Sequence, residues 1–133
     1  MTAIVMLTAA MCTVHPCPKP PAHLTPIGSG LATFYADGVF GQVIRNRDLA
    51  VPPGVIGFAA MLTPERIGSL VWIRWPDGST DGPYLVADCA TAGHRAALIE
   101  RGWIIDVDHG TAVLHGMRGP VTVEIFDRVA PCK

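Results

Sequence analysis

The sequence predicts a single, mainly β domain whose short strands close into a small barrel. Three observations support this prediction: short apolar runs recur along the chain, turns with glycine and proline separate them, and only two brief stretches have helical character. A closed barrel is favoured because closure leaves no exposed sheet edge. With 133 residues, half of them apolar, the chain has enough length for one hydrophobic core.

Residues 1–29 form an apolar and then proline-rich N-terminal segment. The apolar run from Ala3 to Met11 is shorter than the about 20 residues that cross a bilayer, so we expect no transmembrane span. Three alternatives stay open for this run: a signal peptide, a signal peptide shortened at its start, or a strand that is buried or contacts a protein partner. Four prolines between Cys17 and Gly30 oppose both a helix and a central strand, and we expect an extended lead-in there.

Four cysteines are present, and if all were oxidised they would allow three pairings: Cys12, Cys17, Cys89 and Cys132. His15 lies between the first two, which raises the alternative of zinc. A Cys-x4-Cys spacing without a second close pair is a weak zinc pattern, so we expect no metal. We expect Cys12 and Cys17 to form a disulfide if the protein is exported.

The barrel is expected over residues 30–127, followed by a C-terminal tail at 128–133. The strand patterns are LATFY, VIGFAAML, SLVWIRW, YLVADC, WIIDVD and VTVEIF, and the turns between them include VPPG, PDGSTDGP and GMRGP. One short helix is expected at Arg95–Arg101, ended by Gly102, and a second is possible in HGTAVLHGM. The sequence shows no internal repeat, no linker and no second domain.

The order of these pieces carries more information than any one of them. From about Gly30 to Phe126 the chain runs GLATFYADG, FAAMLTPERIGSLVWI, YLVADCA, WIIDVDHGTAVLHGM and GPVTVEIF. This order resembles the double-psi β-barrel of the expansin, barwin and rare lipoprotein A group. That group has G-x-A-[TS]-[FYW]-Y, then A-A-x-x-L-P with a V-x-V strand, V-x-D, [IF]-D-[LV], a short Ala-rich helix and a final V-x-V strand.

Two departures from the group's pattern stand out. Asp108 occupies the position of a serine that follows the family's I-D-L segment, and Asp88-Cys89-Ala90-Thr91 replaces the D-R-G-P of rare lipoprotein A. The resemblance implies a six-stranded double-psi barrel with one or two short helices. It also implies a groove, lined by the first strand and the two aspartate-bearing strands, that holds a polysaccharide.

Thr33, Tyr35 and Asp37 follow one another at a spacing of two in the first predicted strand. Side chains alternate between the faces of a strand, so these three are expected on one face. The resemblance implies that this face meets the sugar. A structural alternative is equally open, in which Tyr35 is a half-buried strand aromatic and Asp37 is a turn residue ahead of Gly38.

Asp106 is the best single candidate for a catalytic acid. It lies in WIIDVD between apolar residues, and a carboxyl group near apolar walls has a raised pKa, as a general acid at neutral pH requires. It matches the I-D-L aspartate, which the resemblance implies is the acid of the lytic members. The alternative is a capping role for the helix that follows, which Asp108 fills more naturally.

Asp88 in LVADC matches the V-x-D aspartate, which in the expansin-like group lies in the same groove. A charged residue at the end of an apolar strand needs a partner, and His94, His109 or Arg95 could provide it. The alternative is a structural ion pair that holds the crossing loops. The two histidines are secondary candidates as proton relays or sugar-binding donors, with plain solvation as the alternative.

Tryptophans offer flat apolar faces on which sugar rings stack, and Trp103, which opens WIID, is the substrate-binding candidate among them. Trp72 and Trp75 are three residues apart, so they should lie on opposite faces of the sheet. At most one of these two can point into the groove, and the other is expected to pack in the core.

Two chemistries fit such a groove, and neither requires a cofactor. In the first, similar to the peptidoglycan lytic transglycosylases, Asp106 protonates the glycosidic oxygen and the sugar's own 6-hydroxyl closes onto the ring. In the second, similar to the barwin-like endoglucanases with their T-x-Y-x-D strand, Asp37 is the base and Asp106 the acid of an inverting pair about 6.5–9.5 Å apart. The cysteine-rich segment of those endoglucanases is missing here, which favours the first chemistry.

Two functions without catalysis stay open beside these. An expansin-like barrel binds and loosens wall polymers without cutting them, and the same barrel could be a structural part of an envelope or phage-tail assembly. Nucleic acid is not expected as a partner, because the ten basic residues form no run and the net charge is −1. The expected partner is peptidoglycan or a related polysaccharide, in the periplasm, outside the cell or on a virion.

Overall fold

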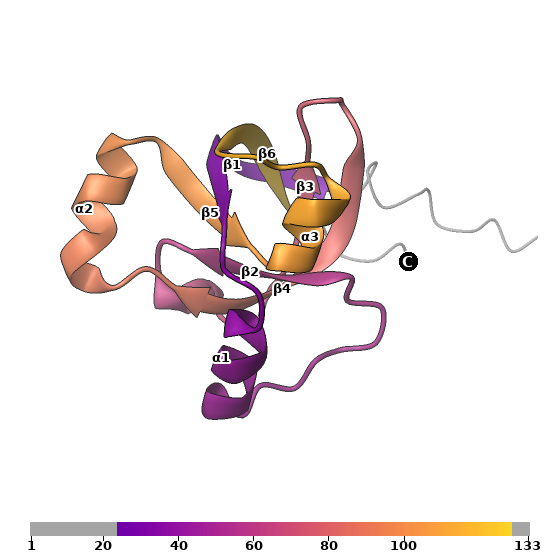
Figure 1. Ribbon diagram of the computed structural model, residues 1–133, viewed down its shortest axis with the longest axis vertical. Helices are drawn as coiled ribbons and strands as arrows, with labels where there is room; N and C mark the ends of the chain where they lie inside the picture. The colour runs from indigo at the N-terminus through magenta and orange to yellow at the C-terminus, as the bar shows by residue number, and fades with distance from the viewer. Residues whose placement is uncertain (1–23, 129–133) are drawn as a thin grey trace, which may run out of the picture.

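The computed structural model describes residues 24–128, which form a closed barrel of six strands with three short α-helices outside it (Figure 1). The strands are β1 (Leu24–Phe34), β2 (Gly57–Met61), β3 (Leu70–Arg74), β4 (Thr80–Cys89), β5 (Trp103–Val107) and β6 (Val121–Arg128). The helices are α1 (Val39–Arg47), α2 (Ala92–Glu100) and α3 (His109–Leu114), with a 3-10 turn η2 at Pro64–Arg66. The predicted mainly β fold with a six-stranded barrel is confirmed.

The barrel is a mixed sheet with the strand order β1-β5-β2-β4-β3-β6. The pairs β1/β5 and β2/β4 are parallel, and the other four pairs are antiparallel. If β1 is exchanged with β4, β2 with β5 and β3 with β6, the strand order around the barrel stays the same. Each parallel pair is then replaced by a parallel pair, and each antiparallel pair by an antiparallel pair. Each half also runs strand, helix, strand, short helix, strand. The connectivity therefore repeats although the sequence does not, and it is compatible with a double-psi barrel.

Helix α1 is the main element that the sequence prediction missed. One or two short helices were predicted, and the structure has three α-helices among the described residues. Gly41 and several β-branched residues give this segment a low intrinsic helix propensity. The helix forms because its apolar side packs on the barrel. Phe40 is 4% exposed and its ring stacks on that of Tyr35 with centroids 4.5 Å apart. Gly38, with a φ of 81°, makes the left-handed turn that starts the helix.

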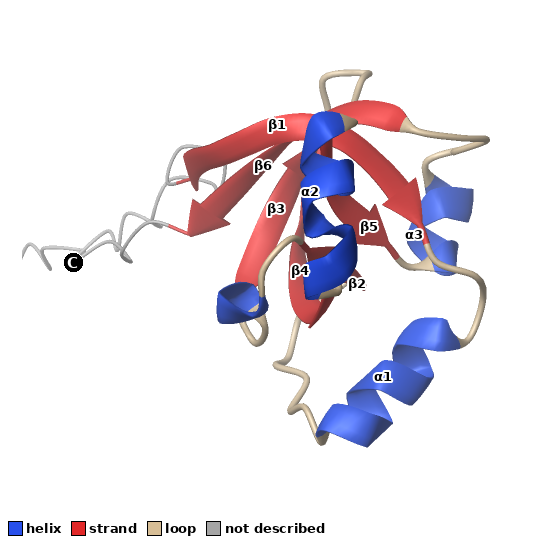
Figure 2. Cartoon of the chain, turned by 90° about the vertical axis from the view of Figure 1, so that its left-hand side faces the viewer, coloured by secondary structure: helices blue, strands red, loops and turns tan. Residues whose placement is uncertain are grey.

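The two predicted helices form close to their expected positions. Helix α2 begins three residues before Arg95 and ends at Glu100, and Gly102 follows it with a φ of 74°. The stretch HGTAVLHGM contains α3. Figure 2 shows α1 and α2 on the outside of the barrel, where α1 packs against β4 and α2 against β5.

Strand β1 begins at Leu24, so it includes residues 24–29, which the sequence places in the proline-rich lead-in. This part of β1 pairs with β6 alone, since pairing with β5 starts at Leu31. Pro26 lies beside an irregularity in the β1/β6 register. A proline is tolerated there because the strand is locally an edge with a bulge. In the part of the chain that the structure describes, no helix is long and apolar enough to cross a membrane.

The hydrophobic core fills the inside of the barrel, with contributions from all six strands. Gly30 allows β1 to approach β5 closely, because a Cβ atom there would lie 2.4 Å from the carbonyl oxygen of Gly102. The glycine of the GLATFY motif is thus a packing requirement. The buried residues of the interior are Ala32, Ala59, Met61, Val71, Ile73, Trp75, Tyr84, Val86, Ile105, Val107, Val123 and Ile125.

Candidate functional site

Four neighbouring strands place a row of paired residues on the outer face of the barrel. Thr33 on β1 pairs with Asp106 on β5, Asp106 pairs with Ala60 on β2, and Ala60 pairs with Asp88 on β4. Paired residues on adjacent strands point to the same face of a sheet. Because Ile105, beside Asp106, points into the core, this row points away from it. Strand register thereby brings together two carboxylates that are 18 positions apart in sequence.

A cavity of about 400 Å³ lies over this row, bordered by the end of α1 and by α2. Arg47 is the last residue of α1, and His94 and Leu98 come from α2. The full lining is Tyr35, Arg47, Asp88, Cys89, Ala90, Thr91, His94, Leu98, Trp103 and Asp106. The structure therefore gathers Tyr35, Asp88, His94, Trp103 and Asp106 from the predicted site residues, with Thr33 bonded to them.

Asp106 is held by two neighbours at a single oxygen. Thr33 Oγ1 donates a hydrogen bond to Asp106 Oδ1, and Trp103 Nε1 donates to the same oxygen at 3.2 Å and to Thr33 Oγ1 at 2.8 Å. Burial raises the pKa of Asp106, and the negative charge of Asp88 raises it further, although the bonds from Thr33 and Trp103 act in the opposite direction. The net shift is upward, as the apolar neighbours in WIIDVD predict.

Asp88 has a hydrogen-bonding partner at each oxygen. Arg47 Nη2 donates to Oδ1 at 2.7 Å, and Tyr35 Oη donates to Oδ2 at 3.2 Å. Burial, and after it the charge of Asp88, raises the pKa of Tyr35, so this hydroxyl stays protonated and can donate. The predicted partner Arg95 instead donates Nε to the carbonyl oxygen of Leu62 at 2.9 Å. Of the three expected partners, none is bonded to Asp88 among the described residues.

Asp37 does not join this cavity. Strand β1 ends at Phe34, so the predicted alternation stops before Asp37, which lies in the turn ahead of Gly38 as the structural alternative proposed. It lines a separate hollow of about 210 Å³ together with Phe58, His109 and others. Asp37 and His109 thus line a different hollow from the one that Asp106 borders.

Asp108 caps α3, as its position after WIIDV predicts. Its Oδ1 accepts from the backbone N–H of Thr111 at 2.8 Å. Its Oδ2 accepts from the Thr111 hydroxyl and from the backbone N–H of Phe58, both at 2.8 Å. One carboxylate therefore ties the start of α3 to β2, two residues after Asp106.

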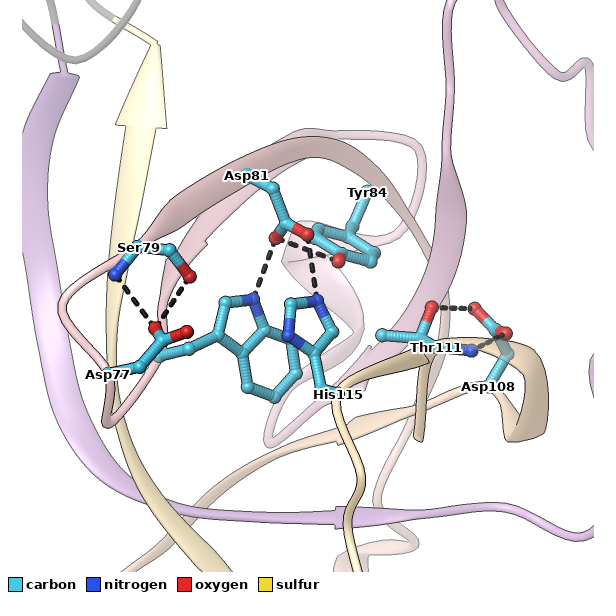
Figure 3. A network of polar contacts seen from close by, with 8 residues as sticks. Asp77, Ser79, Asp81, Tyr84, Asp108, Thr111 and His115 are labelled. Carbon is cyan, nitrogen blue, oxygen red and sulfur yellow. Dashed lines mark hydrogen bonds and ion pairs between the residues drawn. The ribbon is translucent and has the colours of Figure 1, made fainter. Parts of the chain in front are cut away.

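A second polar network lies near the other end of β4 (Figure 3). Asp81 Oδ1 accepts from Trp75 Nε1 at 2.7 Å and from Tyr84 Oη at 2.8 Å, while Asp81 Oδ2 lies 2.8 Å from His115 Nε2. The His115 ring stacks on Trp75 with centroids 3.8 Å apart. Since Trp75 and Tyr84 belong to the interior core, this network joins Asp81 and His115 to the core.

The tryptophans divide between these two regions. Trp103 lines the Asp106 cavity, and Trp75 packs inside the barrel. Trp72 is 8% exposed and lies outside the interior cluster, so Trp72 and Trp75 occupy opposite faces as predicted. Neither of the two borders the Asp106 cavity.

One cysteine lines the Asp106 cavity. Cys89 is a free thiol in its lining. The predicted disulfide between Cys12 and Cys17 lies outside the described residues. Within residues 24–128, no group of three or more histidine, cysteine, aspartate or glutamate side chains is placed to hold a metal ion.

No protein-family model matches this chain, and no curated protein matches it either. The function is therefore inferred from the cavity and from the ordered motifs. The main site residue that the sequence did not indicate is Arg47. It lies in α1, a helix that the low helix propensity of its residues did not indicate. Its partner Asp88 is 41 residues away in sequence.

Proposed function

We propose that this barrel acts on cell-wall polysaccharide as a peptidoglycan lytic transglycosylase-like enzyme with Asp106 as its general acid. The observation that carries the proposal is a partly buried carboxyl group with a raised pKa at the border of a 400 Å³ cavity. A raised pKa lets a carboxyl group keep its proton to a higher pH, and the protonated form can donate that proton to a leaving group. The resemblance to the expansin, barwin and rare lipoprotein A group supplies the substrate class.

The proposed reaction begins with proton transfer from Asp106 to the glycosidic oxygen. The bond from C1 to that oxygen breaks, its electron pair stays on the protonated leaving group, and an oxocarbenium-like centre forms at C1. The sugar's own 6-hydroxyl then attacks C1 and returns its proton to Asp106, which gives a 1,6-anhydro product and restores the acid. The hydrogen bonds from Thr33 and Trp103 stabilise the Asp106 carboxylate between the two transfers.

The environment of Asp88 favours this reaction over inverting hydrolysis. An inverting enzyme needs a second carboxylate that is free to activate water. Arg47 and Tyr35 engage both oxygens of Asp88, and Asp37 lies in another hollow. We propose that Asp88 instead orients the acid and the sugar hydroxyls. Activity would take place in the periplasm, outside the cell or on a virion.

The same contacts favour a second candidate, a non-catalytic expansin-like module that binds glycan. Both carboxylates of the cavity are hydrogen-bonded to neighbouring side chains, which suits a preformed binding surface. Incubation with purified sacculi separates the candidates. Muropeptides with 1,6-anhydro ends support the transglycosylase, and binding without release supports the module. Reducing ends would indicate hydrolysis, and a failure to bind would leave only a structural role in an envelope or tail assembly.

A further inference from the structure

Within residues 24–128, Arg47 uses only part of its hydrogen-bonding capacity. A guanidinium group carries five N–H donors in a planar fork, and the one side-chain bond of Arg47 among these residues joins Nη2 to Asp88. Its side chain is 41% exposed and borders the cavity. The pair with Asp88 is thus one-sided, and a second edge of the guanidinium is available to a ligand.

Arg47 is also the one arginine or lysine among the described residues that line this cavity. Arg95, on the neighbouring helix α2, is engaged with the backbone of Leu62. His94 is the other basic side chain of the lining. A negatively charged group that enters the cavity therefore meets one permanent positive charge, at the end of α1.

Two further features of the cavity make this charge suitable for binding an anion. Tyr35 Oη donates to the second oxygen of Asp88, and this bond restrains Asp88 on the Nη2 side of the guanidinium. Because burial raises the pKa of Asp106, that carboxyl group opposes an incoming anion less than an ordinary aspartate would. An arginine can bridge two carboxylates when each uses a different edge of the fork.

We propose that Arg47 is a specificity-determining residue that binds a carboxylate on the saccharide, so that the site selects acidic sugars over their neutral counterparts. This inference rests on the proposed function, because it assumes that a saccharide occupies the cavity. A carboxylate fits the guanidinium as a planar, two-oxygen acceptor. Arg47 would then set the position of an acidic substituent relative to Asp106.

The test compares two probes that share one glycan and differ in whether their acidic groups are charged. One is a peptidoglycan glycan oligosaccharide with free carboxylates, and the other is the same oligosaccharide with its carboxylates converted to methylamides. Titration calorimetry should show that the protein binds the acidic probe about fivefold more tightly at low salt, the range expected of a partly exposed ion pair. The preference should shrink as added salt screens the charges.

Variants of two neighbouring arginines then assign the preference. R47Q should bring the ratio of the two affinities close to one, and R47K should retain part of it because the charge remains without the fork. R45Q is the matched control, since Arg45 lies on the same last turn of α1 but does not line the cavity. It should keep the ratio of the unmodified protein. Thermal unfolding checks that each variant is folded.

The outcomes separate this inference from the proposed function. An unmodified protein that binds both probes equally, or an R47Q variant that keeps the full preference, overturns the role of Arg47. If 1,6-anhydro products still form in that case, the proposed function stands. If neither probe binds, both the inference and the proposed site are wrong.

Discussion

Replacing Asp108 with alanine should lower the free energy of unfolding by about 2–4 kcal/mol. Loss of the N-cap hydrogen bond that Asp108 accepts from the backbone N–H of Thr111 accounts for about 1 kcal/mol. The backbone N–H of Phe58 also loses its acceptor, and an unsatisfied, partly buried donor costs about 1–3 kcal/mol. The stability of Asp108→Asn should lie between that of the unmodified protein and that of the alanine variant. Asparagine keeps a capping oxygen but turns an NH₂ group toward the Phe58 N–H.

Urea unfolding followed by circular dichroism gives this difference from the midpoint and the slope m. The slope should stay unchanged in both variants, because each of them exposes about as much surface on unfolding as the unmodified protein does. A loss below about 0.5 kcal/mol for the alanine variant, the range of an ordinary surface substitution, would refute the argument. It would mean that Asp108 does not tie α3 to β2 in solution.

Three further outcomes follow from the contacts around Asp106 and Asp108. Gly57→Ala should cost about 1–3 kcal/mol in urea unfolding, because a Cβ atom would lie 2.7 Å from Asp108 Oδ2; an unchanged midpoint would exclude this close packing. Thr33→Val removes a hydrogen bond that lowers the pKa of Asp106, so the alkaline limb of the pH–rate profile should move upward, and no movement or a downward one contradicts the contact. The raised pKa of folded Asp106 makes stability fall as pH rises from the unfolded value of about 3.9 through the folded one. Between pH 3 and 7, the free energy of unfolding should fall more in the unmodified protein than in Asp106→Asn. Parallel curves for the two proteins would contradict this expectation.

Local patterns in the sequence were sufficient for much of the fold. The spacing of Trp72 and Trp75 predicts that they lie on opposite faces of the sheet, and Trp75 is indeed inside the barrel whereas Trp72 is outside the interior cluster. The capping role of Asp108 follows from its position one residue before a helix. Such features depend on neighbours within a few residues, which a sequence displays directly.

The features that sequence missed depend on tertiary contacts. Helix α1 forms because Phe40 packs on Tyr35, which outweighs the low helix propensity of its glycine and β-branched residues. Arg47 consequently reaches Asp88, a contact that no local pattern contains. The sequence left open whether Asp37 lies on the strand or in the turn, because alternation does not show where a strand ends, and β1 ends three residues before it.

The release of 1,6-anhydro muropeptides from sacculi by Asp106→Asn, compared with Asp37→Asn, tests the role of Asp106 most directly. Both variants make the same chemical change, but only Asp106 borders the cavity with Trp103 and Asp88. Asp106→Asn should reduce release by about 100-fold or more, the effect of removing a general acid, and Asp37→Asn should retain most of it. Release by Asp106→Asn at the rate of the unmodified protein would contradict the assignment of the acid.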